Sequence, residues 1–384
     1  MKRNRYRSPV GNILTAILVG VFIAGFGGLA TDVRADEAIE TEAFVAAAAT
    51  PYGAETAEIA AKEAGLARLP HSEGGTRMLL AGGMNFGARL ATDGVLVVGF
   101  GENGSDGRAS AAYRAGVRLS DAILSINGKR MLTSNDVSAA VDASEGKPLT
   151  LLCRRKGETL SFTVTPEKGD GGKYKIGTWL RDSSAGIGTV TFIDPKTLAF
   201  GGLGHGICDP STGEVIPVAR GAVTDAVITG IQRGSAGAPG EMKGYLGKKK
   251  CGTLLTNTEC GLFGILSDLP KGATLLPVGR PSDVTCGEAT LLSTLDSGEV
   301  TPYKIQITAV GQRDTKTKSF SIKVEDEALL AKTGGIIQGM SGSPIIQNGK
   351  LVGAVTHVMV NDPAAGYGIF IENMLTAMPS ILQP

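Results

Sequence analysis

Short runs of alternating apolar and polar residues dominate the chain, and long helical patterns are scarce. The runs begin near Met78, include Gly87–Leu90 and Gly94–Phe100, and return throughout the C-terminal half. Alternation with a period of two is typical of strands that bury one face. A helix-prone stretch covers Ser134–Val141. The pattern therefore predicts a mainly β architecture that is rich in turns.

Changes in composition divide the chain into four parts. Residues 1–35 are basic and then apolar, and residues 36–77 are rich in Ala and Glu, which is typical of a spacer. Strand-like runs and the helix-prone stretch fill residues 78–168, up to a glycine-rich boundary. Short strands follow over residues 173–384, and this length suits a pair of β-barrels or a sandwich.

The first 35 residues indicate a protein that works across a membrane. Basic residues at positions 2, 3, 5 and 7 precede an uncharged apolar run of 18 residues, Ile13 to Ala30. This is just long enough to span a bilayer as a helix, and the basic flank places the rest outside the cytoplasm. Val33-Arg34-Ala35 also resembles a signal-peptide cleavage site. The segment is either an anchor or a cleaved signal, and both predict an extracytoplasmic protein.

Charge and cysteine usage exclude several kinds of site. The net charge of +1 argues against a nucleic-acid surface. The five cysteines form no C-x-x-C pair, and the sequence does not show whether any of them are bridged. The sequence also lacks a phosphate loop and a nucleotide fingerprint. We therefore expect no metal and no cofactor.

A serine set between glycines is the strongest sign of chemistry. The stretch Gly339-Met340-Ser341-Gly342-Ser343-Pro344 precedes a hairpin whose own turn, Asn348-Gly349, already contains the glycine it needs. The additional glycines fit a sharp turn that presents a hydroxyl, because glycine tolerates positive φ and close backbone approach. Ser341 is the candidate nucleophile, and Ser343 is its rival.

A serine nucleophile needs a base, and the chain contains only three histidines. His71 lies in the spacer, and His357 ends a strand-like run. His205 stands among glycines in GGLGHGICD, where little side-chain bulk blocks access. The base in turn needs an acceptor on its other ring nitrogen. Asp209 and Asp326 are both candidates for that acceptor, and spacing does not separate them.

Residues 78–168 resemble a PDZ domain. The pattern runs from Ala115-Gly116-Val117-Arg118-Leu119-Ser120-Asp121 to Ile123-Leu124-Ser125-Ile126-Asn127-Gly128, and Ser120 stands where the family usually has glycine. PDZ domains bind extended peptides by adding a strand to a sheet edge. The resemblance implies that the carboxylate-binding loop comprises Gly82, Gly83, Met84, Asn85 and Phe86. The alternative is that this loop is only a turn.

The C-terminal part is similar to a known family. TGGIIQGMSGSPIIQNGKLVGAVTHVMVNDPAAGYGIFIENML resembles the C-terminal signature of the stage IV sporulation protein B peptidases. The segments LRDSSAGIGT and GGLGHGICD resemble others of the same family, and the resemblance covers nearly the full chain. It implies a chymotrypsin-like double β-barrel with serine peptidase activity over residues 173–384.

The resemblance also implies roles for single residues. The family's triad runs His, Asp, Ser along the chain, so His205 would be the base, Asp326 the orienting acid and Ser341 the nucleophile. The backbone N–H groups of Gly339 and Ser341 would form the oxyanion hole. Each role is an expectation that a structure can test.

The resemblance also implies a strand against which a substrate lies. It comprises Val355, Thr356 and His357, further along the chain than Ser341. Packing is the alternative role of His357. Met340 replaces the Asp that precedes the serine in chymotrypsin-like digestive enzymes, so activation by an ion pair with a new N-terminus is not expected. Cys208 would allow a cysteine peptidase, but such a thiol is more often a small buried residue.

Two hypotheses about function follow. The first is an extracytoplasmic serine endopeptidase of sporulation, located by resemblance between the forespore and mother-cell membranes. It would cleave itself and then a membrane-bound regulator, releasing an intramembrane metalloprotease that processes a sigma-factor precursor. A peptide, its own chain being one candidate, would occupy the PDZ domain. The second hypothesis is a catalytically silent PDZ-based adaptor at the membrane, and the complete trio of triad residues favours the first.

Overall fold

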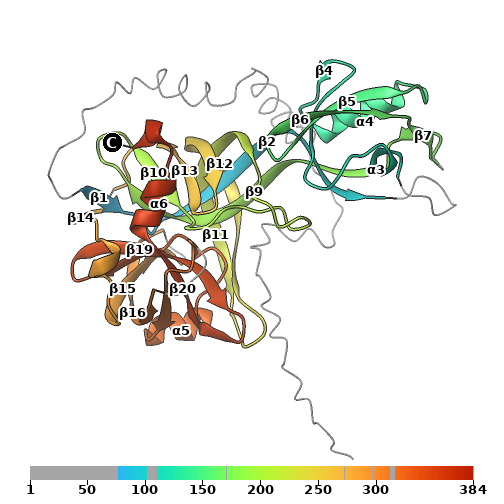
Figure 1. Cartoon of the computed structure of the whole chain (residues 1–384). Coiled ribbons are helices and arrows are strands. Elements are labelled where there is room, and N and C mark those ends of the chain that lie inside the picture. Colours follow the sequence, from blue (N-terminus) through green and yellow to red (C-terminus); the bar gives the residue numbers. More distant parts are fainter. Residues whose placement is uncertain are drawn as a thin grey trace, which may run out of the picture.

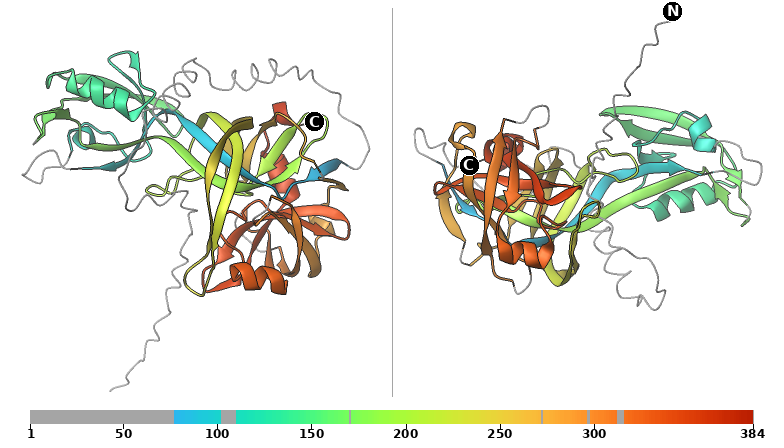
Figure 2. Two further views of the ribbon diagram at one scale, coloured as in Figure 1. Left: turned by 180° about the vertical axis from the view of Figure 1, so that it is seen from behind. Right: turned by 90° about the horizontal axis from the view of Figure 1, so that it is seen from below.

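The computed structural model describes residues 77–101, 110–169, 171–271, 273–295, 298–311 and 316–383. They form two β-barrels and a third body that projects from the first barrel (Figure 1). Figure 2 shows from two further sides that the barrels lie against each other while the third body stands at the end of a long ribbon of strands. The mainly β architecture expected from the alternating pattern is confirmed.

Six strands close the first barrel. β2 (Asn85–Phe100) pairs with both β9 (Thr178–Ile193) and β11 (Val218–Gln232). The ring continues through β12 (Glu241–Thr258), β13 (Gly261–Leu266) and β10 (Ala199–Gly202) back to β9. A ribbon of β1 (Met78–Ala81) and β14 (Thr274–Pro277) is attached to β9. The barrel core is apolar and contains Phe86, Leu90, Phe200 and Leu262.

The second barrel is closed by six antiparallel strands. In order around the ring they are β15 (Gly287–Ser293), β16 (Thr301–Val310), β17 (Phe320–Val324), β20 (Asp362–Phe370), β19 (Lys350–Met359) and β18 (Pro344–Gln347). Two helices accompany them, α5 (Glu327–Thr333) and α6 (Ile371–Ala377), with 3-10 turns at Pro281–Asp283 and Ser380–Leu382. Buried apolar side chains, Phe320, Ile322, Ile345 and Val355 among them, fill the interior. The pair of barrels fits the predicted double-barrel architecture.

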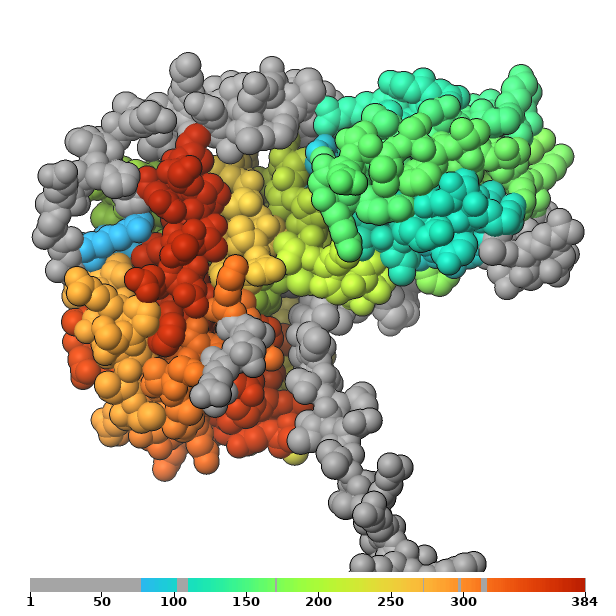
Figure 3. Space-filling model, in the orientation of Figure 1, coloured from blue at the N-terminus to red at the C-terminus, as the bar shows by residue number. Residues whose placement is uncertain are grey.

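The third body holds the residues that resemble a PDZ domain, and Figure 3 shows it set apart from the two barrels. Its elements are α3 (Ala111–Arg114), β3 (Ala122–Ile126), β4 (Lys129–Arg130), α4 (Ser134–Asp142), β5 (Leu149–Arg155), β6 (Glu158–Val164), β7 (Glu167–Lys168) and β8 (Tyr174–Lys175). It has a core of its own, which includes Val97, Ile123, Val137 and Leu151. α4 starts at a capping box, in which the Thr133 hydroxyl accepts from Asp136 N–H and the Asp136 carboxylate accepts from Thr133 N–H.

β2 and β9 run through both the first barrel and the third body, and this corrects the predicted domain boundaries. Each strand has 16 residues, and they pair from Asn85 with Thr189 in the barrel to Phe100 with Thr178 in the third body. Residues 78–92 therefore belong to the barrel, and the PDZ body is an insertion within it. The predicted boundary before residue 173 lies within the PDZ body, because β8 and the start of β9, where Leu180 packs on the core of that body, follow it. A period-two pattern cannot show where one strand passes between two bodies.

The loop Gly82 to Phe86 is also not where the PDZ resemblance placed it. The Gly82 and Gly83 N–H groups donate to Thr191 O (2.9 Å) and Val190 O (2.8 Å) of β9 in the first barrel. A Cβ on Gly82 would lie 2.2 Å from the Val190 oxygen, so the glycine permits close strand approach. The other three residues of the loop also have partners in the barrels or are buried. Met84 packs on the core of the first barrel, the Asn85 side chain donates to Thr294 O, and Phe86 is buried. The prediction that these residues bind the PDZ ligand is wrong.

Several predicted segments lie outside the described residues. They are the basic and apolar segment 1–35, the spacer 36–77 up to residue 76, and His71 within it. Among the described residues, no helix is long and apolar enough to cross a membrane. The anchor or signal function of the N-terminal segment remains a prediction.

Candidate active site

Ser341 occupies a tight turn between α5 and β18 and is half-buried. Gly339 and Gly342 on either side have φ values of 99° and 92°, which residues with a side chain rarely adopt. The Gly342 N–H donates to Val355 O (2.8 Å), and the Ser341 hydroxyl donates to Thr356 O (3.1 Å). The glycines therefore give the turn its shape and bring it against β19.

The serine turn of the second barrel is also docked on β9 of the first. Thr189 donates its N–H to Ser341 O (3.1 Å) and its hydroxyl to Gly339 O (2.7 Å). Two residues further along β9, the Thr191 hydroxyl donates to Gly342 O (2.7 Å). Thr189 and Thr191 are both buried, so these bonds are shielded from water. The turn is thus held at the junction of the two barrels.

His205 follows β10 of the first barrel, in a loop where Leu203 and Gly204 both have positive φ. A Cβ on Gly204 would lie 2.9 Å from Thr356 Cγ2, so this glycine allows the loop to approach β19. Thr356 is the residue whose carbonyl accepts the Ser341 hydroxyl. The loop that carries His205 and the turn that carries Ser341, 136 positions apart in the sequence, therefore meet at Thr356.

The environment of the His205 ring fixes its tautomer. Nδ1 lies 2.9 Å from Gly206 O, and a carbonyl oxygen can only accept a hydrogen bond, so Nδ1 carries the proton. Nε2 is then the unprotonated nitrogen, which a general base requires. Burial lowers the pKa of His205 below its ordinary value, an effect partly offset by the bond to Gly206. The ring is therefore neutral at pH 7.

His357 packs on the His205 ring. The two ring centroids are 5.2 Å apart, and the planes are tilted by 40°. The Nδ1 atom of His357 is buried, with no hydrogen-bond partner among the described residues. Burial, and then the charges of His205 and Lys318, lower the pKa of His357 to about 3. His357 is a neutral packing partner of His205 in this structure.

The segment predicted to bind substrate runs directly behind the serine. Val355 and Thr356 are buried, and their carbonyls accept from Gly342 N–H and the Ser341 hydroxyl. From His357 onward one edge of β19 pairs with β20, and its other edge pairs with no strand among the described residues. An extended peptide could add to that edge. The substrate role of this segment stays a prediction.

Asp326 does not accompany His205 in this structure. Its carboxylate is the N-cap of α5 and accepts from Leu329 N–H (2.9 Å) and Lys304 N–H (3.2 Å). In the sheet, Ser321 pairs with Tyr367, which pairs with His357. Asp326 lies five residues further along from Ser321, roughly 16 Å at the rise of a strand. The orienting role predicted for Asp326 is therefore wrong for this structure, and Gly206 O holds Nδ1 instead.

The alternatives to these residues have structural roles. The Asp209 carboxylate is buried, lies 2.9 Å from the Arg181 guanidinium, and accepts from Ser211 and Thr212 N–H. Ser343 is fully buried behind the turn. Burial raises the pKa of the Cys208 thiol, which disfavours the thiolate that a cysteine peptidase needs. All five cysteines are free.

The two N–H groups predicted to bind an oxyanion are available. Neither the Gly339 N–H nor the Ser341 N–H donates to an acceptor within the described part of the chain. Met340 N–H, by contrast, donates to Ile337 O (3.1 Å). Two unengaged donors beside a serine hydroxyl can stabilise a tetrahedral oxyanion.

A strand edge that suits a peptide is found on β9 in the PDZ body. Thr178–Arg181 pairs with β2 on one side and with no described strand on the other. α4 lies alongside, because Ser134 at its start donates to Asp182 and Asp142 at its end accepts from Tyr174 N–H. Gly177, with a φ of 70°, forms the turn before the strand. The sequence signal for this edge was the glycine in KIGTWLRD.

Sequence reasoning also missed Thr189, Gly206 and Met242. Thr189 lies within an ordinary alternating run, TVTF, and Gly206 acts through its carbonyl oxygen, which every residue has. Met242 contacts the serine turn through its backbone N–H, as described below. No residue type marks the backbone contacts of Gly206 and Met242, and the alternating run around Thr189 does not show that its hydroxyl bonds the serine turn.

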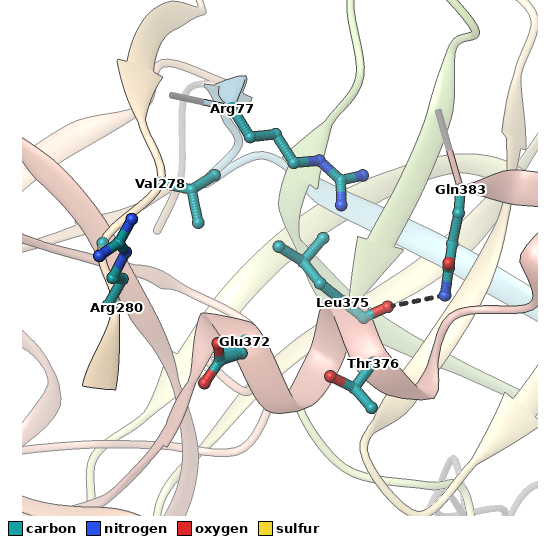
Figure 4. Close-up of a pocket in the computed structure, with 8 residues that line it drawn as sticks. Arg77, Val278, Arg280, Glu372, Leu375, Thr376 and Gln383 are labelled. Atoms are coloured by element: carbon teal, nitrogen blue, oxygen red, sulfur yellow. Dashed lines mark hydrogen bonds between the residues drawn. The ribbon is translucent and has the colours of Figure 1, made fainter. Parts of the chain in front are cut away.

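A pocket of 400 Å³ lies away from these residues, between the end of β14 and α6 (Figure 4). It is lined by Arg77, Val278, Gly279, Arg280, Glu372, Leu375, Thr376 and Gln383. Gln383 closes one side by donating from its side chain to Leu375 O (3.3 Å). None of the predicted site residues lines this pocket. The serine turn is therefore a separate site.

We expect the free energy of unfolding to fall as the pH drops below about 6.5, because of His357. Its pKa is about 3 in the folded protein and near 6.5 in an unfolded chain. Between these values the unfolded state binds more protons, so acid favours unfolding. His205 contributes in the same direction because burial lowers its pKa as well. Urea unfolding at pH 7.5 and pH 5 measures the loss.

The matched variant is His357→Asn, which keeps a polar side chain and removes the titrating group. It should lose less stability between the two pH values than the wild type does. An equal loss in both proteins would contradict the role given to His357.

Two curated relatives are similar over short stretches. Serine protease HTR4 of Bos taurus is 47% identical over 60 residues, which cover 16% of this chain and 12% of that protein. Zinc metalloprotease RasP of Geobacillus kaustophilus is 40% identical over 57 residues, 15% of this chain and 14% of that protein. The matched part thus spans a quarter or less of the length of the curated relatives.

Solved structures of proteases are similar over about half of the chain. The active form of the Rv3671c protease from M. tuberculosis covers 51% of this chain and 73% of its own, with 16% identity and a TM-score of 0.30. The HtrA-type protease AlgW with a decapeptide covers 54% of both chains, with 16% identity and a TM-score of 0.30.

Two protein families match the sequence directly. Residues 107–155 match the PDZ domain, within the body that β2 and β9 carry. Residues 172–375, more than half of the 384 positions, match the SpoIVB peptidase S55 family. This range includes the serine turn and Thr189, on which the turn is docked. The chain, whose His205 loop and Ser341 turn meet at Thr356, therefore belongs to the SpoIVB peptidase S55 family.

Proposed function

We propose that the protein is a serine endopeptidase. The observation that carries the proposal is that two segments meet at Thr356: the loop of the neutral His205, through Gly204, and the serine turn, through the Ser341 hydroxyl. The unengaged N–H groups of Gly339 and Ser341 add an oxyanion hole. Base, nucleophile and oxyanion donors are the parts that acyl transfer requires.

The mechanism starts when a substrate carbonyl enters the oxyanion hole. The Ser341 hydroxyl turns from Thr356 O toward Nε2 of His205, which takes its proton as the oxygen attacks. His205 then gives the proton to the leaving amine, and water hydrolyses the acyl-enzyme by the same steps. Gly206 O, which holds Nδ1–H, keeps the ring in the required tautomer. One oxyanion donor is typically worth about 3–4 kcal/mol of the barrier.

The substrates we propose are proteins. Family membership supports the wider context of the proposal, in which the enzyme acts outside the cytoplasm in sporulation. There it cleaves itself and then a membrane-bound regulator of an intramembrane metalloprotease. The basic and apolar segment 1–35 supports the location. A peptide bound at the free edge of Thr178–Arg181, between β9 and α4, is the partner that the PDZ body suits.

Hydrolysis of unfolded casein by the full chain tests the proposed activity. We expect cleavage that a sulfonyl fluoride blocks and that neither a metal chelator nor a thiol alkylating reagent affects. Cleavage abolished by the chelator or the alkylating reagent would overturn the serine mechanism. A folded chain that binds peptides and cleaves nothing would favour the adaptor.

A further inference from the structure

The hairpin formed by β11 and β12 reaches beyond the first barrel to the second (Figure 1). Among its connecting residues, 233–240, Gly234 N–H donates to Thr333 O and Gly237 N–H donates to Val360 O (2.8 Å each), both in the second barrel. Gly234 is buried, and a Cβ on the facing Gly334 would lie 2.3 Å from Gly234 O. The hairpin tip is therefore closely fitted against the residues that precede the serine turn.

The same hairpin holds both backbone groups of Gln338. Gln338 N–H donates to Gly240 O (2.8 Å), and Gln338 O accepts from Met242 N–H (2.9 Å). Glu241, between them, forms a parallel bridge with Gln338. Gly339 follows Gln338 directly, and a Cβ on Gly339 would lie 3.0 Å from Met242 Sδ. The hairpin thus fixes the residue next to the oxyanion hole.

Fixing Gln338 O determines where the Gly339 N–H points. The two groups belong to one planar trans peptide unit, in which C=O and N–H point in opposite directions. Because Met242 N–H holds the oxygen on the hairpin side, the Gly339 N–H faces the opposite side, where it has no acceptor among the described residues. If the hairpin released Gln338 O, this peptide unit could rotate and remove the donor.

The other oxyanion donor is held from within the second barrel. Ser341 N–H shares its peptide unit with Met340 O, which accepts from Ser343 N–H (2.9 Å). Gly339 O, between the two units, accepts from the Thr189 hydroxyl. Of the two donors, only the Gly339 N–H depends on the β11–β12 hairpin.

We propose that the β11–β12 hairpin is the positioning element of the oxyanion hole, acting through Met242 N–H and Gly240 O on Gln338. This rests on the proposed peptidase function and deepens it, because it makes the active conformation conditional on the docked hairpin. Met242 touches no substrate. It acts through the peptide unit that carries the Gly339 N–H.

The test compares two glycine substitutions in the same hairpin. In Gly240→Ala the Cβ would lie 2.3 Å from Gln232 O and 2.7 Å from Ile337 Cγ2, which displaces the tip from Gln338. Gly230→Ala is the control, because nothing lies within 4 Å of its Cβ. We expect Gly240→Ala to lower kcat for a peptide substrate roughly 10²- to 10³-fold, the usual effect of losing one oxyanion donor. KM should change less than about threefold.

Two further readouts separate positioning from general damage. The acid limb of the pH profile, which reports His205, should be unchanged in Gly240→Ala. A peptide aldehyde forms an oxyanion when it binds, so its affinity should fall in Gly240→Ala by about the same factor as kcat. The affinity for a product peptide should not fall. Met242→Pro, which removes the N–H to Gln338 O together with the buried Met242 side chain, provides a second variant if Gly240→Ala does not fold.

The outcomes distinguish this inference from the proposed function. An active wild type with equal kcat in Gly240→Ala and Gly230→Ala, or with full kcat in Met242→Pro, overturns the hairpin's role and leaves the peptidase standing. A wild type without peptidase activity overturns the proposed function, and the hairpin's role with it.

Discussion

Alanine at His205 is expected to lower kcat/KM for casein-derived peptides by roughly 10⁵- to 10⁶-fold, as when a serine peptidase loses its general base. The reason is that the Ser341 hydroxyl is barely ionised at neutral pH and needs Nε2 to take its proton. Folding should survive, because the ring is only half-buried and its main contacts are Gly206 O and the His357 ring. Steady-state kinetics with circular dichroism as the folding control measures both.

The matched comparison is Asp326→Asn. If Asp326 only caps α5, this variant should keep kcat/KM within about threefold and lose at most about 1 kcal/mol of stability, since Asn is also a good N-cap. A loss as deep as that of His205→Ala would show that Asp326 reaches the base in a conformation other than this one. It would restore the triad implied by the family resemblance.

Among alanine substitutions of the glycines in the serine turn, Gly342→Ala is expected to lower stability and activity most. Its Cβ would lie 2.2 Å from Thr189 O and 2.4 Å from Leu203 N, both backbone atoms that cannot turn aside. The φ of 92° adds strain. The clash would push the turn off β9 and away from His205. We expect a loss of about 3 kcal/mol in stability and at least a 10²-fold loss in kcat.

Gly349→Ala separates the clash from the strain. Gly349 also has a positive φ, 73°, but nothing lies within 4 Å of its Cβ. It should cost about 1 kcal/mol and leave kcat unchanged. Equal effects of the two substitutions in urea unfolding and kinetics would mean that the contact between the turn and β9 does not matter.

The parts of the site that could be predicted are those in which a residue type has a local reason. Ser341 is the candidate nucleophile because its glycines exceed what the hairpin needs, and the positive φ values of Gly339 and Gly342 match the sharp turn expected there. His205 is the candidate base because only three histidines exist and one stands among glycines. In both cases glycine marks a close backbone approach, which sequence can indicate.

The parts that failed depend on partners far away in the chain. Asp326 was taken as the orienting acid, yet an Asp two positions after a strand and at the start of a helix is an equally good N-cap. Only the sheet register shows how far Asp326 is from His357. Ser321 lies level with His357 across Tyr367, and Asp326 is five residues, roughly 16 Å, further along the chain. Carboxylates carry no mark that separates these roles.

The PDZ boundaries failed for a different reason. The motif from Ala115 to Gly128 was sufficient to identify the domain, but the domain is an insertion, so its flanking strands belong to two bodies. Gly82 and Gly83 look like a ligand loop because both a ligand loop and a close strand contact need glycine. The mainly β class, in contrast, followed directly from the alternating pattern.

Mass spectrometry of the full chain after treatment with a fluorophosphonate tests the central claim most directly. His205 and the oxyanion hole should activate one hydroxyl, so we predict a single adduct on Ser341 that is absent from Ser341→Ala and strongly reduced in His205→Ala. An adduct on Ser343, or no adduct on a folded wild-type chain, would contradict the account.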